Sequence, residues 1–371
     1  MEHYVQAASI RWYNACAYYA VALSRGIHSL GRRVTFAGRD GVPSVEKARS
    51  SGIDVFTRPA PKFENPVEYI TTIRVYRKFA VENNVTLVNV HNGNDHALWA
   101  LALRGTGIPL VRTSGNRLPP KAHIGSKFLQ RKTAGFIASC NTVRTNYADR
   151  LGIDPQNIRV LNGGINSRHF SPGHTRGLLR EQLGIKEDAF VFGIIGRYSP
   201  VKGHSHFFRA AGQVSPKYPD VRFVVSGWDA QLTENDIRKM ANDAGVFEKT
   251  GFVDFQHDIR DLIGSIDAGV VASTGSETVC RIAMEYMAMG IPVIAADTNV
   301  IPEVVRHGES GIIVPAGDHK AMASAMEQVM TSKDKGKAMG QRGREIVETD
   351  YSLEAFAQQT LDAYRSFTGY A

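Results

Sequence analysis

Cysteine and long apolar runs are scarce in this 371-residue chain. Cys16, Cys140 and Cys280 lie far apart and form no C-x-x-C pair, which argues against a disulfide framework and against a cysteine metal site. No apolar run reaches the roughly 18 residues that a membrane span requires, and the first residues lack the apolar core of a signal peptide. We therefore expect a cytoplasmic protein.

Acidic residues are scarce in the first half. Residues 1–170 hold 23 Lys and Arg against 10 Asp and Glu, a net charge of +13, whereas residues 171–371 hold 21 against 26, a net charge of −5. The stretch 112–132 carries six basic residues, no acidic one, and interleaved leucine, isoleucine and phenylalanine. This asymmetry predicts an anionic partner. Our hypothesis is peripheral binding to an anionic membrane, at the cytoplasmic face of the inner membrane, and no nucleic-acid partner; a phosphorylated soluble acceptor, or a domain that is basic without functional meaning, is the alternative.

No expected strand is followed by a convincing G-x-G-x-x-G, which disfavours an NAD-dependent dehydrogenase. The length fits two domains, and short apolar runs alternate with amphipathic stretches, which predicts parallel sheets in an α/β fold. The expected strands are 4–8, 34–37, 86–90, 110–112, 135–138, 158–160, 189–195, 222–226, 268–271 and 292–295, with helices between them, for example at 15–30, 67–82 and 98–104.

The alternation restarts near residue 189, after a segment at 166–176 whose Pro172 and Gly173 are typical of an interdomain linker. We therefore predict two doubly wound, Rossmann-like domains, one over residues 1–170 and one over 171–351. Each is expected to bind ligands at the carboxyl ends of its strands.

A basic, glycine-containing turn follows the first expected strand of the second half. In the run G-I-I-G-R-Y-S-P-V-K-G-H, Gly196, Arg197, Lys202 and Gly203 come directly after that strand. Glycines let a backbone approach a phosphate, and the N-terminus of the following helix presents free N–H groups and a partial positive charge. The pattern predicts a diphosphate site with Arg197 and Lys202 as its cations; solvated basic side chains are the alternative.

Two glutamates follow the expected strand at 268–271. Glu277 and Glu285 are separated by seven residues, and Glu285 lies in a run rich in Ala, Met and Ile. A carboxylate without a partner would be costly there. Sugar hydroxyls are natural partners, and a salt bridge along a helix is the alternative.

These motifs make the chain resemble glycosyltransferase family 4, the retaining GT-B enzymes, over nearly its whole length. L-N-G-G-I-N-S-R-H-F-S-P (161–172) resembles the family's N-G-V-D-x-x-x-F-x-P signature, and G-R-Y-S-P-V-K-G (196–203) is similar to its G-R-L-x-x-x-K-G clamp. Glu277 through Glu285 match its E-x7-E element. I-P-E-V-V-R-H-G-E-S-G-I-I-V-P-A-G-D (301–318) resembles its P-E-V-V-x-x-G-x-x-G-x-L-V-P-x-x-D stretch.

The resemblance implies the GT-B fold, in which two Rossmann-like domains face each other across a cleft. The final helix at 352–367 looks like the family segment that crosses back to the first domain, so the C-terminal residues, about 352–371, are expected to pack there.

The resemblance also implies residue roles. Arg197 and Lys202 hold the donor diphosphate, Glu285 hydrogen-bonds the ribose, and Glu277 faces the donor sugar. The base is expected near 251–253, contacted mainly by backbone. The implied donor set is Gly196, Arg197, Lys202, Gly251, Phe252, Val253, Thr278, Val279, Cys280, Glu285 and Asn14; the catalytic set is Arg197, Lys202, Glu277 and His91.

Several loops depart from the family pattern. W-Y-N-A (12–15) occupies the region of the family's first glycine pair, with the Asn14 amide expected near the donor phosphate. Thr278 and Cys280 stand where the family has glycine, and N-V (299–300) replaces another glycine pair.

No histidine follows the strand that ends near Val111, where the family often has one. His91, directly after the strand 87–90, is therefore the candidate on the acceptor side, with a structural or exposed histidine as the alternative. The acceptor-side set is His91, His96, Arg112, Asn116 and Arg117.

The implied function is that of a retaining hexosyltransferase, which moves a hexose-type sugar from a nucleoside-diphosphate sugar to a hydroxyl. A UDP-sugar is the first expected donor and GDP-mannose the second. The expected acceptor is a cell-surface glycan or glycolipid precursor, such as a lipopolysaccharide intermediate. A GT-B-fold nucleotide-sugar epimerase and a non-catalytic GT-B binding protein are the alternatives.

No D-x-D triplet, with which many sugar transferases hold a metal, occurs in the sequence. We therefore expect no metal and no cofactor, the nucleotide sugar being a co-substrate. Arg197, Lys202 and helix dipoles are then expected to stabilise the leaving diphosphate.

Overall fold

The computed structural model describes residues 2–58, 65–173, 177–256, 258–275 and 277–369. The chain forms two compact units: unit 1 is Met1–Gly164 with Tyr351–Ala371, and unit 2 is Ile165–Asp350. The first boundary therefore lies at residues 164–165, whereas the sequence pattern places it at 170. Residues 174–176 of the expected linker lie outside the described ranges.

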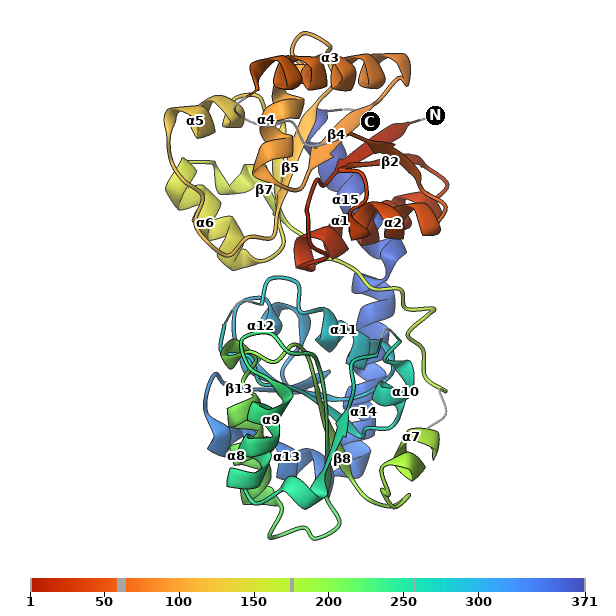
Figure 1. Ribbon diagram of the computed structural model, residues 1–371, viewed down its shortest axis with the longest axis vertical. Helices are drawn as coiled ribbons and strands as arrows, with labels where there is room; N and C mark the ends of the chain where they lie inside the picture. Colours follow the sequence, from red (N-terminus) through yellow and green to blue (C-terminus); the bar gives the residue numbers. More distant parts are fainter. Residues whose placement is uncertain (1, 59–64, 174–176, 257, 276, 370–371) are drawn as a thin grey trace. The chain divides into compact units, whose positions relative to one another are not determined.

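Unit 1 is a parallel sheet with helices on both faces (Figure 1). Its strand order is β3-β2-β1-β4-β5-β6-β7. The strands are β1 (His3–Ala7), β2 (Arg33–Gly38), β3 (Asp54–Thr57), β4 (Leu87–Val90), β5 (Leu110–Ser114), β6 (Gly135–Ala138) and β7 (Ile158–Val160). The helices are α1 (Ala15–Ser29), α2 (Pro43–Ser50), α3 (Pro66–Glu82), α4 (Gly93–Ala102), α5 (Ile124–Gln130), α6 (Asn141–Leu151) and α15 (Leu353–Thr368), with the short turn η1 (Pro155–Asn157).

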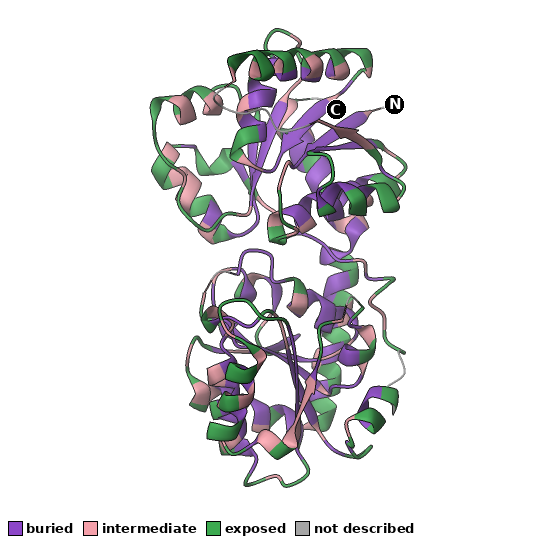
Figure 2. Cartoon of the chain, viewed as in Figure 1, coloured by how far each residue is buried: buried purple, intermediate pink, exposed green. Residues whose placement is uncertain are grey.

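Side-chain alternation along β1 explains the two helical layers of unit 1. Val5 and Ala7 pack in one core cluster with Tyr76 of α3 and Trp99 of α4. Gln6, which lies between them, instead hydrogen-bonds the Tyr364 hydroxyl of α15. Successive side chains of a strand point to opposite faces, so α3 and α4 cover one face and α15 the other. The inner strands β1, β4, β5 and β6 are wholly buried between these layers (Figure 2).

The C-terminal helix joins unit 1 because α1 offers a close approach. A Cβ on Gly26 would lie 2.2 Å from the carbonyl oxygen of Leu353, so a larger residue would force α15 away. Tyr19 of α1 packs edge-on against Phe356 of α15, with ring centroids 4.7 Å apart. Such T-shaped aromatic pairs add to the stability from area burial. Residues 351–369 thus belong structurally with the start of the chain.

Unit 2 repeats the parallel design. Its strand order is β10-β9-β8-β11-β12-β13. The strands are β8 (Val191–Ile195), β9 (Arg222–Ser226), β10 (Thr250–Val253), β11 (Ala268–Val271), β12 (Val293–Asp297) and β13 (Gly311–Pro315). The helices are α7 (Gly177–Gln182), α8 (His204–Val214), α9 (Glu234–Asp243), α10 (Arg260–Gly264), α11 (Arg281–Ala288), α12 (Ile301–Val304), α13 (His319–Thr331) and α14 (Lys333–Ile346), with the short turns η2 (Pro200–Lys202), η3 (Phe247–Lys249) and η4 (Val347–Tyr351).

The expected α/β class with two Rossmann-like units is confirmed, but three strands were missed. β3, β10 and β13 each lie at an edge of a sheet. An edge strand is paired on one side only, so it needs a shorter and less continuous apolar run than a central strand. β3 begins with an exposed Asp54, and β10 is only half-buried over most of its length.

A buried arginine fixes the start of the central strands of unit 2. Arg180 of α7 pairs with Asp267 at 2.6 Å and donates to the carbonyl oxygens of Ser265 and Ala189. Asp267 also accepts from the backbone N–H of Val191. The two charges therefore pair with each other and with backbone groups at the starts of β8 and β11. These two strands position the site described below.

Several helix starts are capped by side chains that the sequence supplies locally. Asn14 caps α1, Asn65 caps α3 directly before Pro66, Thr233 caps α9 and Asp318 caps α13. Each accepts backbone N–H groups that have no partner within the helix. Within the described ranges, none of these helices has the length and apolarity needed to cross a membrane.

Candidate functional site

The basic turn of unit 2 lies at the carboxyl edge of its sheet. The strand order reverses between β8 and β11, the switch point at which doubly wound sheets bind ligands. Gly203, with φ of 74°, precedes α8, and a Cβ there would lie 1.9 Å from the carbonyl oxygen of Ala272. Thr274 N donates to Val201 O at 2.9 Å. The turn at 196–203 is therefore held directly against the loop that follows β11.

This contact joins the two predicted motifs. Lys202 forms a short ion pair with Oε1 of Glu277, which also accepts a hydrogen bond from Oγ of Ser273 at 2.7 Å. The Glu277 side chain is 8% exposed and that of Lys202 23%. Two residues 75 positions apart thus share one site. The sequence patterns did not predict Ser273; its place just after β11 was the available signal.

Arg197 remains available for a ligand. It is exposed in the same turn, and no described residue forms an ion pair with it. Its neighbour Tyr198 is buried and its N–H donates to the carbonyl oxygen of Trp228, which fixes the turn to the loop after β9. A held backbone with a free guanidinium suits anion binding.

Glu285 of α11 is buried and satisfied on one oxygen only. Arg281 Nε lies 2.9 Å from its Oε1, so the salt bridge along the helix, foreseen as an alternative, is formed. Oε2 is buried and has no hydrogen-bond partner among the described residues. Burial raises the pKa of Glu285, and the charge of Arg281 opposes this rise. The free oxygen can accept a hydrogen bond from a ligand hydroxyl.

Cys280 lies between the two glutamates in a strained conformation. Its φ of 40° and ψ of 51° fall in the left-handed region, which costs a non-glycine residue about 1–2 kcal/mol. Thr278, Val279 and Cys280 are all buried. Burial raises the pKa of the Cys280 thiol, the charges of Glu277 and Glu285 raise it further, and the charge of Lys202 opposes the rise. Cys280 thus has a backbone conformation that normally favours glycine. Ser276, which precedes Glu277, lies outside the described residues.

The segment expected near the base lies farther from the basic turn. Gly251, Phe252 and Val253 belong to β10, and β9 separates β10 from β8. Gly251 faces Leu183, and the Arg238 guanidinium lies 4.2 Å from the centre of the Phe252 ring. Side chains here serve packing, so the backbone contact with a base stays a prediction.

An exposed aromatic pair lies at the same edge of the sheet and was not predicted. Trp228 follows β9 and Phe255 follows β10, with ring centroids 5.0 Å apart and an edge-on arrangement. Both are about half exposed. The pair therefore adds apolar surface at the edge where doubly wound sheets bind ligands.

In unit 1, His91 is part of a buried polar network. Its Nε2 lies 3.0 Å from Oε1 of Gln6, which also accepts from Asn89 Nδ2. Nε2 donates to that oxygen in the tautomer that carries its proton on Nε2. Burial and the nearby Arg112 lower the pKa of His91 to about 3. At neutral pH this histidine is therefore a hydrogen-bonding group and a weak proton acceptor.

His96 and Arg112 are also buried in unit 1. His96 Nε2 lies 2.8 Å from the Thr133 hydroxyl, which itself donates to Leu129 O, so His96 links α4 to the end of α5. Burial and Arg112 lower the pKa of His96 to about 3. Arg112 donates to the carbonyl oxygen of Val90 at the end of β4. The structure thus brings Arg112 to the carboxyl edge near His91 and gives His96 a bridging role.

The remaining predicted residues lie in exposed loops of unit 1. Asn14 uses its side-chain oxygen to accept the N–H groups of Cys16 and Ala17, which is a capping role. Asn116 accepts from Leu118 N within the loop after β5, and the carbonyl oxygen of Arg117 accepts from Asn146. Their ligand contacts stay predictions. Over the described ranges, His, Cys, Asp and Glu side chains form no group of three or more suited to a metal ion.

Known protein families match both units of the chain. The family model "Glycosyl transferases group 1" matches residues 175–346, and "Glycosyltransferase Family 4" matches residues 17–169. The first match contains the basic turn and both glutamates. The group 1 glycosyltransferase model thus covers most of unit 2, and the family 4 glycosyltransferase model covers most of unit 1.

Relatives of this chain include curated proteins and solved structures. It is 27% identical over 286 residues to the D-inositol 3-phosphate glycosyltransferase of Kribbella flavida, covering 73% of this chain and 67% of that protein. It is 29% identical over 285 residues to the protein of the same name from Mycobacterium marinum, covering 73% and 60%. The chain spans between 52% and 67% of the length of the first curated relatives.

The fold likeness extends over the whole chain. The crystal structure of Anabaena HepE in complex with UDP superposes with a TM-score of 0.84 at 18% identity, covering 99% of this chain and 100% of that one. The two units therefore have the GT-B fold.

Proposed function

We propose that this protein is a group 1 glycosyltransferase that moves a hexose-type sugar from a nucleoside-diphosphate sugar to an acceptor hydroxyl, with retention at the anomeric carbon. One observation carries the proposal: Lys202 pairs with Glu277 at the switch point of unit 2, and the next helix, α11, holds Glu285 with one oxygen that has no partner among the described residues. A cation, a carboxylate held by that cation, and a buried acceptor without a donor fit a ligand that carries both phosphate and hydroxyl groups.

The proposed chemistry uses these groups in different ways. The bond between the anomeric carbon and the diphosphate oxygen breaks, and the diphosphate leaves with the electron pair. Lys202 and Arg197 stabilise the growing negative charge, as fixed cations do best where water is excluded. The acceptor oxygen attacks from the side that the diphosphate leaves, and its proton passes to the departing phosphate. Glu285 holds the ribose hydroxyls and Glu277 orients toward the donor sugar.

We further propose that the reaction needs no metal. Arg197 and Lys202 supply the positive charge that a metal supplies in enzymes with D-x-D, a triplet missing from this sequence. His91, with its low pKa, is proposed to orient the acceptor through a hydrogen bond, together with Arg112 in unit 1.

Two acceptor classes are worth separating. A glycan or glycolipid precursor of the cell surface, such as a lipopolysaccharide intermediate, is the first. A phosphorylated polyol is the second, because several curated relatives are D-inositol 3-phosphate glycosyltransferases. The basic first half of the chain, with a net charge of +13 over residues 1–170, suits either an anionic lipid-linked acceptor or a phosphorylated soluble one.

The test measures nucleoside diphosphate release from a donor panel. UDP-sugars come first, because the Anabaena protein of the same fold was crystallised with UDP, and GDP-mannose second. Each donor is incubated with inositol 3-phosphate, with lipid-linked glycan, and without acceptor. The anomeric configuration of the product is read by NMR.

Matched variants make the result specific. Lys202→Ala should abolish most release, whereas Lys217→Ala, which removes a surface lysine of the same unit paired with Glu327, should leave it unchanged. A product of inverted configuration would overturn retention. Conversion of the donor into an epimer without transfer would favour the epimerase alternative, and donor binding without turnover a non-catalytic role.

A further inference from the structure

One face of α5 in unit 1 is exposed, basic and apolar at once. Ile124 is 89% exposed and Phe128 45%, and Lys127 and Arg131 are exposed beside them. Positions three and four apart share a face of a helix, so these four side chains form one continuous stripe. We name this stripe the α5 face. No residue of α5 is buried.

The opposite side of α5 shows that the helix is anchored and not merely loose. Leu129 packs against the core cluster that α3 and α4 form with β1 and β4. At its start, His123 and Ser126 cap each other's backbone N–H groups. The helix is therefore held by one side, and the α5 face points away from the core.

The stretch of chain that contains α5 carries charge of a single sign. No Asp or Glu occurs between Asp95 and Asp149, a stretch that contains eight Lys and Arg. Leu118, 64% exposed, adds apolar surface in the loop before the helix, three positions before Lys121 in the sequence. A solvated helix of a globular protein normally mixes both signs of charge and exposes few large apolar groups.

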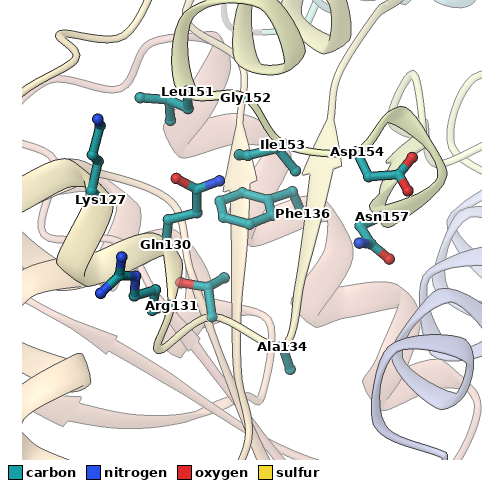
Figure 3. A pocket seen from close by; sticks show the side chains of 11 residues that line it. Lys127, Gln130, Arg131, Ala134, Phe136, Leu151, Gly152, Ile153, Asp154 and Asn157 are labelled. Carbon is teal, nitrogen blue, oxygen red and sulfur yellow. The ribbon is translucent and has the colours of Figure 1, made fainter.

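A pocket continues the α5 face inward. Lys127, Gln130 and Arg131 line one side of a cavity of about 460 Å³, and Asp154 and Asn157 line another. Figure 3 shows the ring of Phe136 between these two sides, with Leu151 and Ile153 close to it. The rim of the cavity thus carries two cations, Lys127 and Arg131, and one carboxylate, Asp154, around the ring of Phe136. Its net positive charge suits an anionic headgroup.

We propose that the α5 face docks unit 1 on the surface of an anionic lipid bilayer. Ile124 and Phe128 enter the interface, as apolar side chains of interfacial helices do. Lys127 and Arg131 face the lipid phosphates, and the adjoining cavity accepts one headgroup. The inference goes beyond the glycosyl transfer proposed for unit 2, because every residue that carries it lies in unit 1.

The test is co-sedimentation with vesicles of phosphatidylcholine alone and with phosphatidylglycerol added. We expect binding to the anionic vesicles only, and weaker binding at 1 M salt, where the screening length falls to about 3 Å. Lys127→Glu with Arg131→Glu should weaken binding at least 30-fold, since each basic residue near such a surface contributes about 1 kcal/mol, a factor of about five. Ile124→Ser with Phe128→Ser should weaken it about tenfold or more.

The control pair is Lys335→Glu with Lys337→Glu, on α14 of unit 2, which changes the net charge equally from two exposed positions. An equal loss of vesicle binding in both charge-reversed double variants would refute the α5 face as the docking surface. Equal binding of the wild type to neutral and anionic vesicles would refute it as well. Release by millimolar inorganic phosphate, beyond that caused by chloride of the same ionic strength, would assign the cavity to a soluble phosphate and refute the bilayer. Glycosyl transfer to a soluble acceptor should be unchanged in all these variants, so a failed donor assay and a failed docking assay remain distinguishable.

Discussion

Replacing Glu285 by glutamine should weaken donor binding without weakening the fold. The change keeps the shape of the side chain and the hydrogen bond that Oε1 accepts from Arg281 at 2.9 Å. It replaces the buried Oε2, which has no partner among the described residues, by an amide NH₂ group. A ligand hydroxyl that donates to a carboxylate then meets a donor in place of an acceptor.

The magnitude follows from the charge on the lost acceptor. Hydrogen bonds to charged groups contribute about 1.5–3 kcal/mol, which corresponds to about 10- to 150-fold in the dissociation constant of the nucleotide. A ribose contact exists in the ground state and in the transition state alike. The loss should therefore raise KM more than it lowers kcat.

The same substitution should raise the free energy of unfolding or leave it unchanged. Burial raises the pKa of Glu285, so the ionised carboxylate disfavours folding. A carboxyl with a raised pKa contributes stability that is fully present below the pKa of the unfolded chain and is lost as pH rises through the folded pKa. At neutral pH the neutral amide avoids this loss, so Glu285→Gln should unfold at the same temperature as the wild type or higher.

Two measurements on the same samples check the reasoning. Calorimetric titration with UDP and GDP gives the affinity, and thermal unfolding at pH 5 and pH 8 gives the stability. Glu327→Gln is the matched control, since Glu327 pairs with Lys217 at the surface of the same unit. Unchanged nucleotide affinity in Glu285→Gln, or a marked loss of stability with or without loss of affinity, would refute the assignment.

The remaining predictions concern the clamp, the metal and the buried histidines. Lys202→Ala or Arg197→Ala should lower kcat by about 10²–10³, the range for removing one fixed charge stabiliser; wild-type turnover in either variant would exclude the clamp. Activity should persist in excess EDTA, and an activity that EDTA abolishes and Mg²⁺ or Mn²⁺ restores would contradict the metal-free mechanism. His91 and His96 have pKa values lowered to about 3. Between about pH 3 and about 6.5 the native state therefore binds fewer protons than the unfolded chain. The free energy of unfolding should fall as pH falls through this range, by up to about 1.4 kcal/mol per pH unit for each histidine. Urea unfolding at pH 7 and 5 measures this slope, which His96→Gln should reduce; a slope unaffected by the substitution would show that His96 is not responsible.

Much of the architecture follows from patterns that are local in the sequence. Alternating apolar runs predicted the central strands of both sheets, because a central parallel strand is buried on both faces and must be apolar throughout. The turn at Gly203 was predictable for the same kind of reason. Its positive φ and the 1.9 Å distance that a Cβ would have from the Ala272 carbonyl oxygen admit only glycine. A single glycine in the sequence therefore indicates this turn.

The edge strands and the partners of the charged groups were decided only by the tertiary structure. Glu285 lies in an apolar run of the sequence, which predicted either a salt bridge or a ligand. The structure forms the salt bridge on one oxygen, and the other oxygen has no partner among the described residues. The sequence contains no sign that Lys202 would pair with Glu277 or that Ser273 would join them. Their meeting depends on β8 and β11 being neighbours, which the spacing along the chain does not state.

The fate of the candidate histidines shows the same division. His91 and His96 are five residues apart and read alike in sequence, as imidazoles after an apolar strand. In the folded unit, His91 joins Gln6 and, through it, Tyr364 of the C-terminal helix, whereas His96 reaches Thr133 beside α5. The sequence by itself determined the residue types and the local backbone. The strand order and the packing of α15 on unit 1 decided which of these groups came into contact. Hydrogen bonds and charge pairs depend on distances in space, and the sequence specifies only the separation of residues along the chain.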